Sequence, residues 1–249
     1  AKVLKTRRTA AALLLTTKTS SAFVILFMAP GNDVRVASEI ATWMPGYKEL
    51  SVGNHLFMTI QWMLSSFANE GKAFFIAIWA AGFLLLVKSK KAKVYQSLAV
   101  VFSVVALLPY AGISFFSEMG IGYIDIEQCL TELPTWQTMT TQNRIAFFWW
   151  IAAVLFTLVL LWKVTGHSVF ISMVFLGGIA SEAVLHFSPT IYASGARVYY
   201  LTDLMYLFII LWMVMRMDSE KKKNLFIAGA AALGIINFLS QYSIMLLKL

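Results

Sequence analysis

The chain has few charged residues and almost no cysteine. Charged residues make up 13% of its 249 positions and hydrophobic residues 59%, whereas a soluble domain carries about 25% charged residues. The single cysteine, Cys129, cannot form an intrachain disulfide. No Cys/His cluster has metal-ligand spacing, and no glycine pattern of a phosphate-binding loop or dinucleotide fold occurs. These absences exclude a disulfide scaffold, a zinc finger and a soluble nucleotide-binding domain.

Apolar runs of nearly 20 residues recur along the whole chain instead. They predict an all-α fold, a polytopic transmembrane helical bundle in which residues 1–249 form a single membrane domain. The expected spans are 9–29, 72–87, 95–115, 145–162, 168–186, 198–215 and 225–247, which makes about seven. The semi-polar segment 53–70 is predicted to be an interfacial helix, with Leu56, Ile60 and Phe67 buried against lipid or protein and Gln61 and Ser66 on its polar face.

Basic residues gather in short runs between these apolar segments. "AKVLKTRR", "KSKKAK" and "DSEKKK" carry much of the excess behind the net charge of +8. By the positive-inside rule these runs lie in the cytoplasm, so the charge sets orientation and does not indicate a nucleic-acid partner. The N-terminus is then cytoplasmic. The loops around 30–35, 117–143 and 187–197 are then all expected on the extracytoplasmic side. The polar loop residues that could bind a ligand are therefore gathered on one side of the membrane.

The segment "TTKTSS", residues 16–21, does not fit a simple span. Lys18 lies about 18 Å along a helix axis from Pro30. Two interpretations stay open: either Lys18 faces a polar cavity in the bundle, or the first span is broken or misplaced.

The first polar loop, "APGNDVR", comes directly after that span. Pro30 and Gly31 stop a helix, and Asn32 and Asp33 either turn the chain or cap the next segment. Arg35 is then either a side chain that snorkels to the interface or a binding group.

The second polar loop, "HFSPTIYASGARVYY", contains more side chains that could bind a ligand. Ser188 and Pro189 end one span, Gly195 permits a tight turn and Arg197 opens the next span. A guanidinium on a short, rigid loop suits a phosphate or pyrophosphate, and Tyr192 suits a lipid or sugar. The alternative is an aromatic belt with an interfacial arginine.

Two acids flank this loop at similar depth. Glu182 precedes Ser188 and Asp203 follows Arg197 by the same spacing, about 9 Å along each helix. His186 shares a helix face with Glu182. Ionisable groups at that depth face a cavity or a partner, so the acids are predicted to point into the bundle. The alternative is a structural ion pair, such as Arg197 with Asp203 or Lys18 with Glu182.

"FMAPGNDVR" and "SPTIYASGARVYY", with the hydropathy pattern, resemble the C-terminal half of a family of bacterial multi-span proteins. These are similar to GT-C-type glycosyltransferases related to O-antigen and teichoic-acid glucosyltransferases. The resemblance covers about residues 20–215. It implies a polyprenyl-phosphate-linked sugar donor, a cell-surface glycan acceptor and a bacterial plasma membrane. The family carries its catalytic acid in the first external loop of an N-terminal module, and Asp33 is the only acid here that could play that part. We therefore expect this chain to be the C-terminal part of a larger protein of this kind.

The resemblance also implies roles for single residues. Arg35 and Arg197 would neutralise the donor phosphate, and Asp33 or Glu182 would be the general base. The remaining predicted substrate-binding residues are Asn32, His186, Ser188, Tyr192 and Asp203. No cofactor is implied, and dependence on a divalent metal stays open. Two other classes remain: a transporter or flippase for an anionic lipid-linked substrate, which Lys18 favours, and a non-catalytic subunit of a membrane partner.

Overall fold

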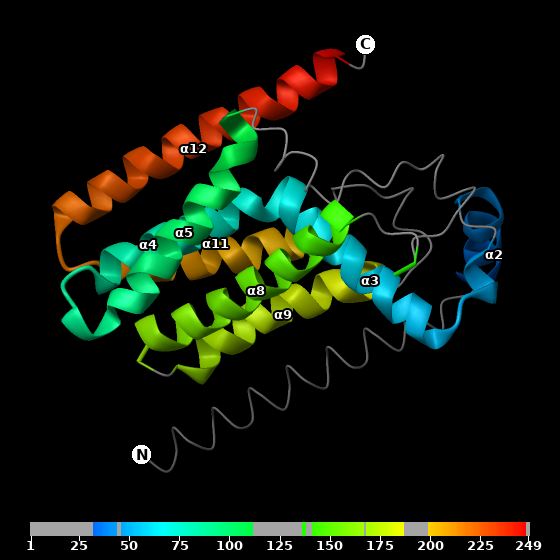
Figure 1. Ribbon diagram of the computed structural model, residues 1–249, viewed down its shortest axis with the longest axis horizontal. Helices are drawn as coiled ribbons and strands as arrows, with labels where there is room; N and C mark the ends of the chain where they lie inside the picture. The colour runs from blue at the N-terminus through cyan, green and yellow to red at the C-terminus, as the bar shows by residue number, and fades with distance from the viewer. Residues whose placement is uncertain are drawn as a thin grey trace.

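Every element in the described part of the computed structural model is helical. The structure describes residues 32–43, 46–111, 136–137, 141–166, 168–186 and 199–247. The α-helices are α2 (Asn32–Trp43), α3 (Val52–Ser66), α4 (Lys72–Leu86), α5 (Lys93–Leu107), α8 (Thr141–Val164), α9 (Val169–His186), α11 (Tyr200–Met215) and α12 (Glu220–Leu247). The π-helical segment η2 (Phe67–Gly71) joins α3 to α4 (Figure 1). Short 3-10 segments are η1 (Tyr47–Glu49), η3 (Lys90–Ala92) and η4 (Leu108–Ala111).

The predicted apolar segments correspond closely to helices. Those at 72–87, 95–115, 145–162, 168–186, 198–215 and 225–247 correspond to α4, α5, α8, α9, α11 and α12. Among the described residues, three helices are long and apolar enough to cross a membrane: Arg144–Val164, Val169–His186 and Glu220–Leu239. The apolar helices Lys72–Leu86 and Tyr200–Met215 are shorter. Segment 9–29, with Lys18, lies outside the described residues, and the total of seven spans stays a prediction.

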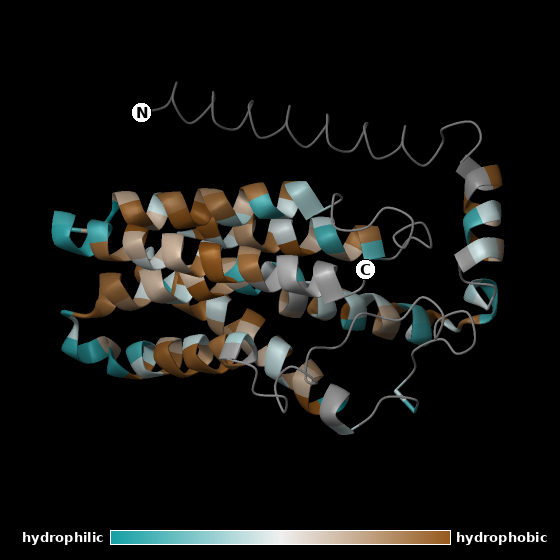
Figure 2. Cartoon of the chain, turned by 90° about the horizontal axis from the view of Figure 1, so that it is seen from above, coloured by the Kyte–Doolittle hydropathy of each residue, from teal (hydrophilic) through white to brown (hydrophobic). Residues whose placement is uncertain are grey.

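Helix α2 was not predicted. The loop "APGNDVR" was interpreted as a helix stop, yet a helix begins at Asn32 and continues to Trp43. Asn32 and Asp33 are therefore the first two residues of a helix, and whether their side chains cap it stays a prediction. Figures 1 and 2 place α2 beyond the outer end of α3 and apart from the bundle.

The predicted polar face of segment 53–70 is wrong, while the prediction for its apolar face holds within the bundle only for Phe67. Phe67 is buried, whereas Leu56 and Ile60 are 51% and 38% exposed on the protein surface, where their burial against lipid stays a prediction. Gln61 and Ser66, predicted to be on the polar outer face, are buried. The reason is that α3 packs against α9 and α8, which buries its polar side chains: Ser66 meets the carboxylate of Glu182, while Gln61 Oε1 has no hydrogen-bond partner within the described part of the chain.

Aromatic side chains fill the centre of the bundle. The ring of Phe75 on α4 lies 5.8 Å from Trp79, 5.6 Å from Trp150 on α8 and 5.7 Å from Tyr206 on α11, measured between ring centroids. Trp79 Nε1 donates a hydrogen bond of 2.8 Å to Thr157 Oγ1, which satisfies the indole inside this core. One buried cluster thus joins α4, α8 and α11.

The lysine-rich loops meet at one end of the bundle. Lys88, after α4, lies 2.8 Å from Asp218, which precedes α12, and Lys222 lies 2.8 Å from the same carboxylate. Figure 2 shows this hydrophilic end at the left, followed by the hydrophobic middle of the helices. We call it the basic end. Helix α9 runs away from it and α11 returns to it, so His186 and Tyr200 lie at the opposite end.

Candidate functional site

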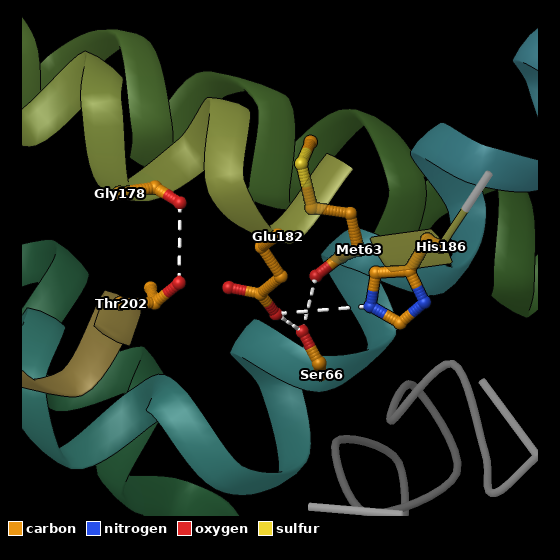
Figure 3. A network of polar contacts seen from close by, with 6 residues as sticks. All are labelled: Met63, Ser66, Gly178, Glu182, His186 and Thr202. Atoms are coloured by element: carbon orange, nitrogen blue, oxygen red, sulfur yellow. Dashed lines mark hydrogen bonds and ion pairs between the residues drawn. The ribbon is translucent and has the colours of Figure 1, made fainter. Parts of the chain in front are cut away.

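A buried carboxylate marks the end of the bundle opposite the lysines. Glu182, in the last turns of α9, is 2% exposed. The hydroxyl of Ser66, at the end of α3, donates a hydrogen bond to Glu182 Oε1 and also contacts the carbonyl of Met63 at 2.8 Å (Figure 3). His186 lies one turn after Glu182, with Nε2 3.8 Å from the same Oε1. The helical i,i+4 spacing therefore places acid and imidazole together as predicted.

A close contact between α9 and α11 fixes the opposite wall. Thr202 Oγ1 donates a hydrogen bond of 3.2 Å to the carbonyl of Gly178. A Cβ atom added to Gly178 would lie 3.0 Å from the ring of Tyr206. The absence of a side chain at Gly178 therefore lets α11 approach closely, and this approach sets the positions of Asp203 and Tyr206 beside Glu182.

Two more acids face this region. The carboxylates of Asp203 on α11 and Glu70 in η2 are both close enough to Glu182 for electrostatic repulsion. Asp203 is half-buried, while Glu70 is more exposed. Three helical segments thus bring three acids toward one place. No group of three or more Asp, Glu, His or Cys within the described ranges has a geometry that could hold a metal ion.

Several buried polar atoms here lack a hydrogen-bond partner within the described part of the chain. They are Nδ1 and Nε2 of His186 and the hydroxyl of Tyr206. The two residues are 3% and 1% exposed. Buried polar groups in folded proteins are nearly always satisfied. Within the described part of the chain, these atoms therefore remain able to donate or accept hydrogen bonds to a ligand or a water molecule.

A lysine and a tyrosine lie close together where α4, η4 and α12 meet, at the same end of the bundle as Glu182. Lys72 Nζ, at the start of α4, lies 4.4 Å from the ring centroid of Tyr110. The Tyr110 hydroxyl donates a hydrogen bond of 2.6 Å to Asn237 Oδ1 on α12. This group links α4, η4 and α12, and it places a cation close in sequence to Glu70.

Aromatic residues surround the start of α8. Arg144 donates a hydrogen bond of 3.0 Å to the carbonyl of Trp136 and lies 5.0 Å from its ring centroid. Phe57 on α3 packs edge-on against Trp136 with ring centroids 5.9 Å apart. Trp136 is 39% exposed, so its ring is available for stacking at the border of the site end.

The structure brings together only some of the predicted site residues. Glu182 is buried and adjacent to His186, and Asp203 is half-buried near them. Asn32, Asp33 and Arg35 belong to α2, but their side chains lie outside the described part. Ser188, Tyr192 and Arg197 also lie outside the described residues. Their roles remain predictions.

Sequence reasoning missed Ser66, Glu70 and Tyr206 as members of the site. The signal available was "NEGK", residues 69–72, which interrupts two apolar stretches with opposite charges. It coincides with the π-helical segment η2, and π-bulges inside helices occur frequently at functional sites.

The chain matches no protein-family model, no curated protein and no solved structure.

Proposed function

We propose that the chain is a membrane glycosyltransferase, or the donor-binding half of one. Its donor is a sugar linked to polyprenyl phosphate, and its acceptor is a hydroxyl of a cell-surface glycan. It resides in the bacterial plasma membrane as a multi-pass protein, with a cytoplasmic N-terminus. The basic end faces the cytoplasm, and the end that contains Glu182 faces outward.

The observation that carries this proposal is the separation of the two ends. Glu182, His186, Tyr199 and Asp203 gather at one end, while Lys88, Lys222 and their neighbours gather at the other. The outer surface between them is apolar on several helices: exposed large side chains include Phe148, Leu155, Val159, Phe170, Met173, Leu207, Leu211 and Ile227. A soluble monomer rarely exposes so many large apolar side chains on its helices, which supports a membrane location.

The transfer needs a base and a stabilised leaving group. The acceptor hydroxyl gives its proton to Glu182 while its oxygen attacks the anomeric carbon of the donor sugar. The bond from that carbon to the phosphate oxygen breaks, and its electron pair leaves with the phosphate. Arg197, with Arg35, neutralises this phosphate, because a guanidinium fork matches phosphate oxygens. His186 and Tyr192 shape the sugar pocket, with Asn32, Ser188 and Asp203 as further binding residues.

Between the two candidate bases, the structure favours Glu182. It is buried and hydrogen-bonded at the site end, whereas Asp33 belongs to a helix that stands apart from the bundle in Figures 1 and 2. A base held by Ser66 in a buried place keeps its position between turnovers.

The fate of a lipid-linked sugar tests this proposal. Purified protein in proteoliposomes is supplied with a polyprenyl-phosphate hexose, labelled in the sugar, and a soluble glycan acceptor outside. A transferase moves the label to the acceptor and leaves polyprenyl phosphate. A flippase moves the intact donor between leaflets without consuming it. A donor-binding half binds the donor and transfers only when its partner module is added. A protein that neither binds nor consumes the donor would contradict the proposal.

A further inference from the structure

An apolar groove lies between α4, α5 and α12, away from the site. Its volume is about 500 Å³. It extends from Leu84 and Leu225, near the basic end, to Leu107 and Ile236. Nearly all of its lining residues are apolar, with Ser103 as the exception.

Small residues create this space. Ala80 on α4, Ala99 on α5, and Gly229 and Ala230 on α12 all line the groove. A Cβ atom added to Gly229 would meet no atom within 4 Å. The groove between the helices therefore stays open because these residues are small, and larger side chains at the same positions would fill it.

The length of the groove corresponds to one leaflet of a bilayer. Leu225 to Ile236 covers about 16 Å of helix axis. Half of the hydrocarbon core of a bilayer is about 15 Å thick. A narrow apolar groove of this length, between helices, suits a flexible acyl chain.

Exposed lysines lie near the end of the groove that is next to the basic end. We call this end of the groove its mouth. Lys221 precedes Leu225 by about 6 Å of helix axis, and Lys93 precedes Ala99 by about 9 Å. Lys221, Lys93 and Lys90 are exposed, and none forms an ion pair with an acid of the described residues. Lys88, Lys222 and Lys223 are paired with Asp218 or Glu220 instead. The mouth of the groove is thus positively charged.

We propose that this groove binds one anionic phospholipid, with an acyl chain between α4, α5 and α12 and the phosphate headgroup on Lys90, Lys93 and Lys221. Anionic lipids are attracted to basic groups at the membrane surface, and the apolar lining supplies the seat for the chain. This inference depends on the membrane location proposed above and not on sugar transfer.

The test compares retention of phosphatidylglycerol and phosphatidylcholine by the purified protein, offered as an equimolar mixture and counted by native mass spectrometry. Gly229→Leu fills the groove. Gly234→Leu is its matched control, because Gly234 lies on the same helix, also has open space around it and does not line the groove. Both changes raise helix propensity equally. The triple change Lys90→Gln, Lys93→Gln and Lys221→Gln removes the headgroup contacts, and Lys48→Gln is an exposed basic control in η1.

We expect the wild type to retain phosphatidylglycerol in preference to phosphatidylcholine. Gly229→Leu should lower that retention at least tenfold, while Gly234→Leu and Lys48→Gln leave it unchanged. The triple glutamine variant should bind both lipids equally. Equal retention of the two lipids by the wild type, or full retention by Gly229→Leu, would overturn the proposal. A dimer that Gly229→Leu converts to a monomer would also overturn it, since the groove would then belong to a second copy of the chain. None of these readouts involves sugar transfer, so they leave the proposed function to be judged separately.

Discussion

The hydroxyl of Ser66 on α3 donates a hydrogen bond to the carboxylate of Glu182 on α9, across 116 positions of sequence. Both side chains are buried. This contact fixes α3 against α9 at the site end of the bundle. It also explains why the serine face of α3 points inward, because a buried carboxylate needs donors and the apolar residues of α3 cannot supply them.

Replacing Ser66 with alanine should destabilise the protein by about 1–3 kcal/mol, because a buried acceptor loses its donor. Thermal unfolding in detergent measures the change. Thr42→Ala is the control, since Thr42 donates a similar hydrogen bond to the carbonyl of Ser38 on an exposed surface. If the two variants unfold at the same temperature, the Ser66 contact does not stabilise the bundle.

Gly82→Ala should destabilise the packing of α4 on α8. A Cβ at Gly82 would lie 2.7 Å from Leu160 Cδ2 and 3.0 Å from its Cγ, and Leu160 is fully buried. Overpacking of this kind costs about 1–3 kcal/mol.

The control for this contact is Gly234→Ala, which has open space and should gain about 0.5–1 kcal/mol from helix propensity. The free energy of unfolding of both variants, measured with denaturant in the same detergent, gives the comparison. Equal stabilities for the two alanine variants would show that α4 and α8 do not approach each other at Gly82.

Acid should weaken the basic end through Asp218. Hydrogen bonds from Lys222 and then Lys88 lower the pKa of Asp218 well below its usual value of 3.8. A lowered pKa in the folded state means that the two contacts contribute their full stability above that usual value. The contribution is lost as the pH falls below it, through the pKa of the folded state.

The unfolding midpoint of the wild type should therefore fall more steeply than that of Asp218→Asn below about pH 4. The two proteins should become equally stable in stronger acid. Because Asp218 is exposed, added salt should shrink the difference at neutral pH as well. A difference between the two proteins that persists unchanged into strong acid would show that the carboxylate does not act through its charge.

Arg197→Ala should weaken donor binding by roughly 10- to 150-fold, the equivalent of about 1.5–3 kcal/mol for a charge-assisted contact. Arg197→Lys should retain part of the affinity, since it keeps the charge and loses the bidentate fork. Binding of a polyprenyl-phosphate sugar by folded variants in detergent measures this. If Arg197 instead pairs with Asp203, Arg197→Ala would lower stability, Asp203→Asn would partly restore it, and donor affinity would stay at the wild-type value.

The apolar helices could be predicted because a long run of apolar residues nearly always forms a helix buried in a membrane or a protein core. Helices α4, α9 and α12 begin or end within a few residues of the predicted limits. The pairing of Glu182 with His186 followed from helical spacing alone. By contrast, Ser66 and Glu70 could not be assigned, because their approach to Glu182 depends on how η2 directs α3 toward α9, and no local pattern encodes that packing. The prediction that the polar face of α3 points to water failed for the same reason. It assumed that the polar side chains of an amphipathic helix face water, whereas those of α3 face other helices of the bundle.

We propose that Glu182 takes the proton of the acceptor hydroxyl. Single-turnover sugar transfer by Glu182→Gln, with donor affinity measured separately, is the decisive test of this role. Glu220→Gln is the control, because Glu220 is exposed at the basic end. We predict that Glu182→Gln binds the donor as the wild type does but transfers the sugar about 10²- to 10⁴-fold more slowly, while Glu220→Gln transfers at the full rate. Transfer by folded Glu182→Gln at the wild-type rate would contradict the account.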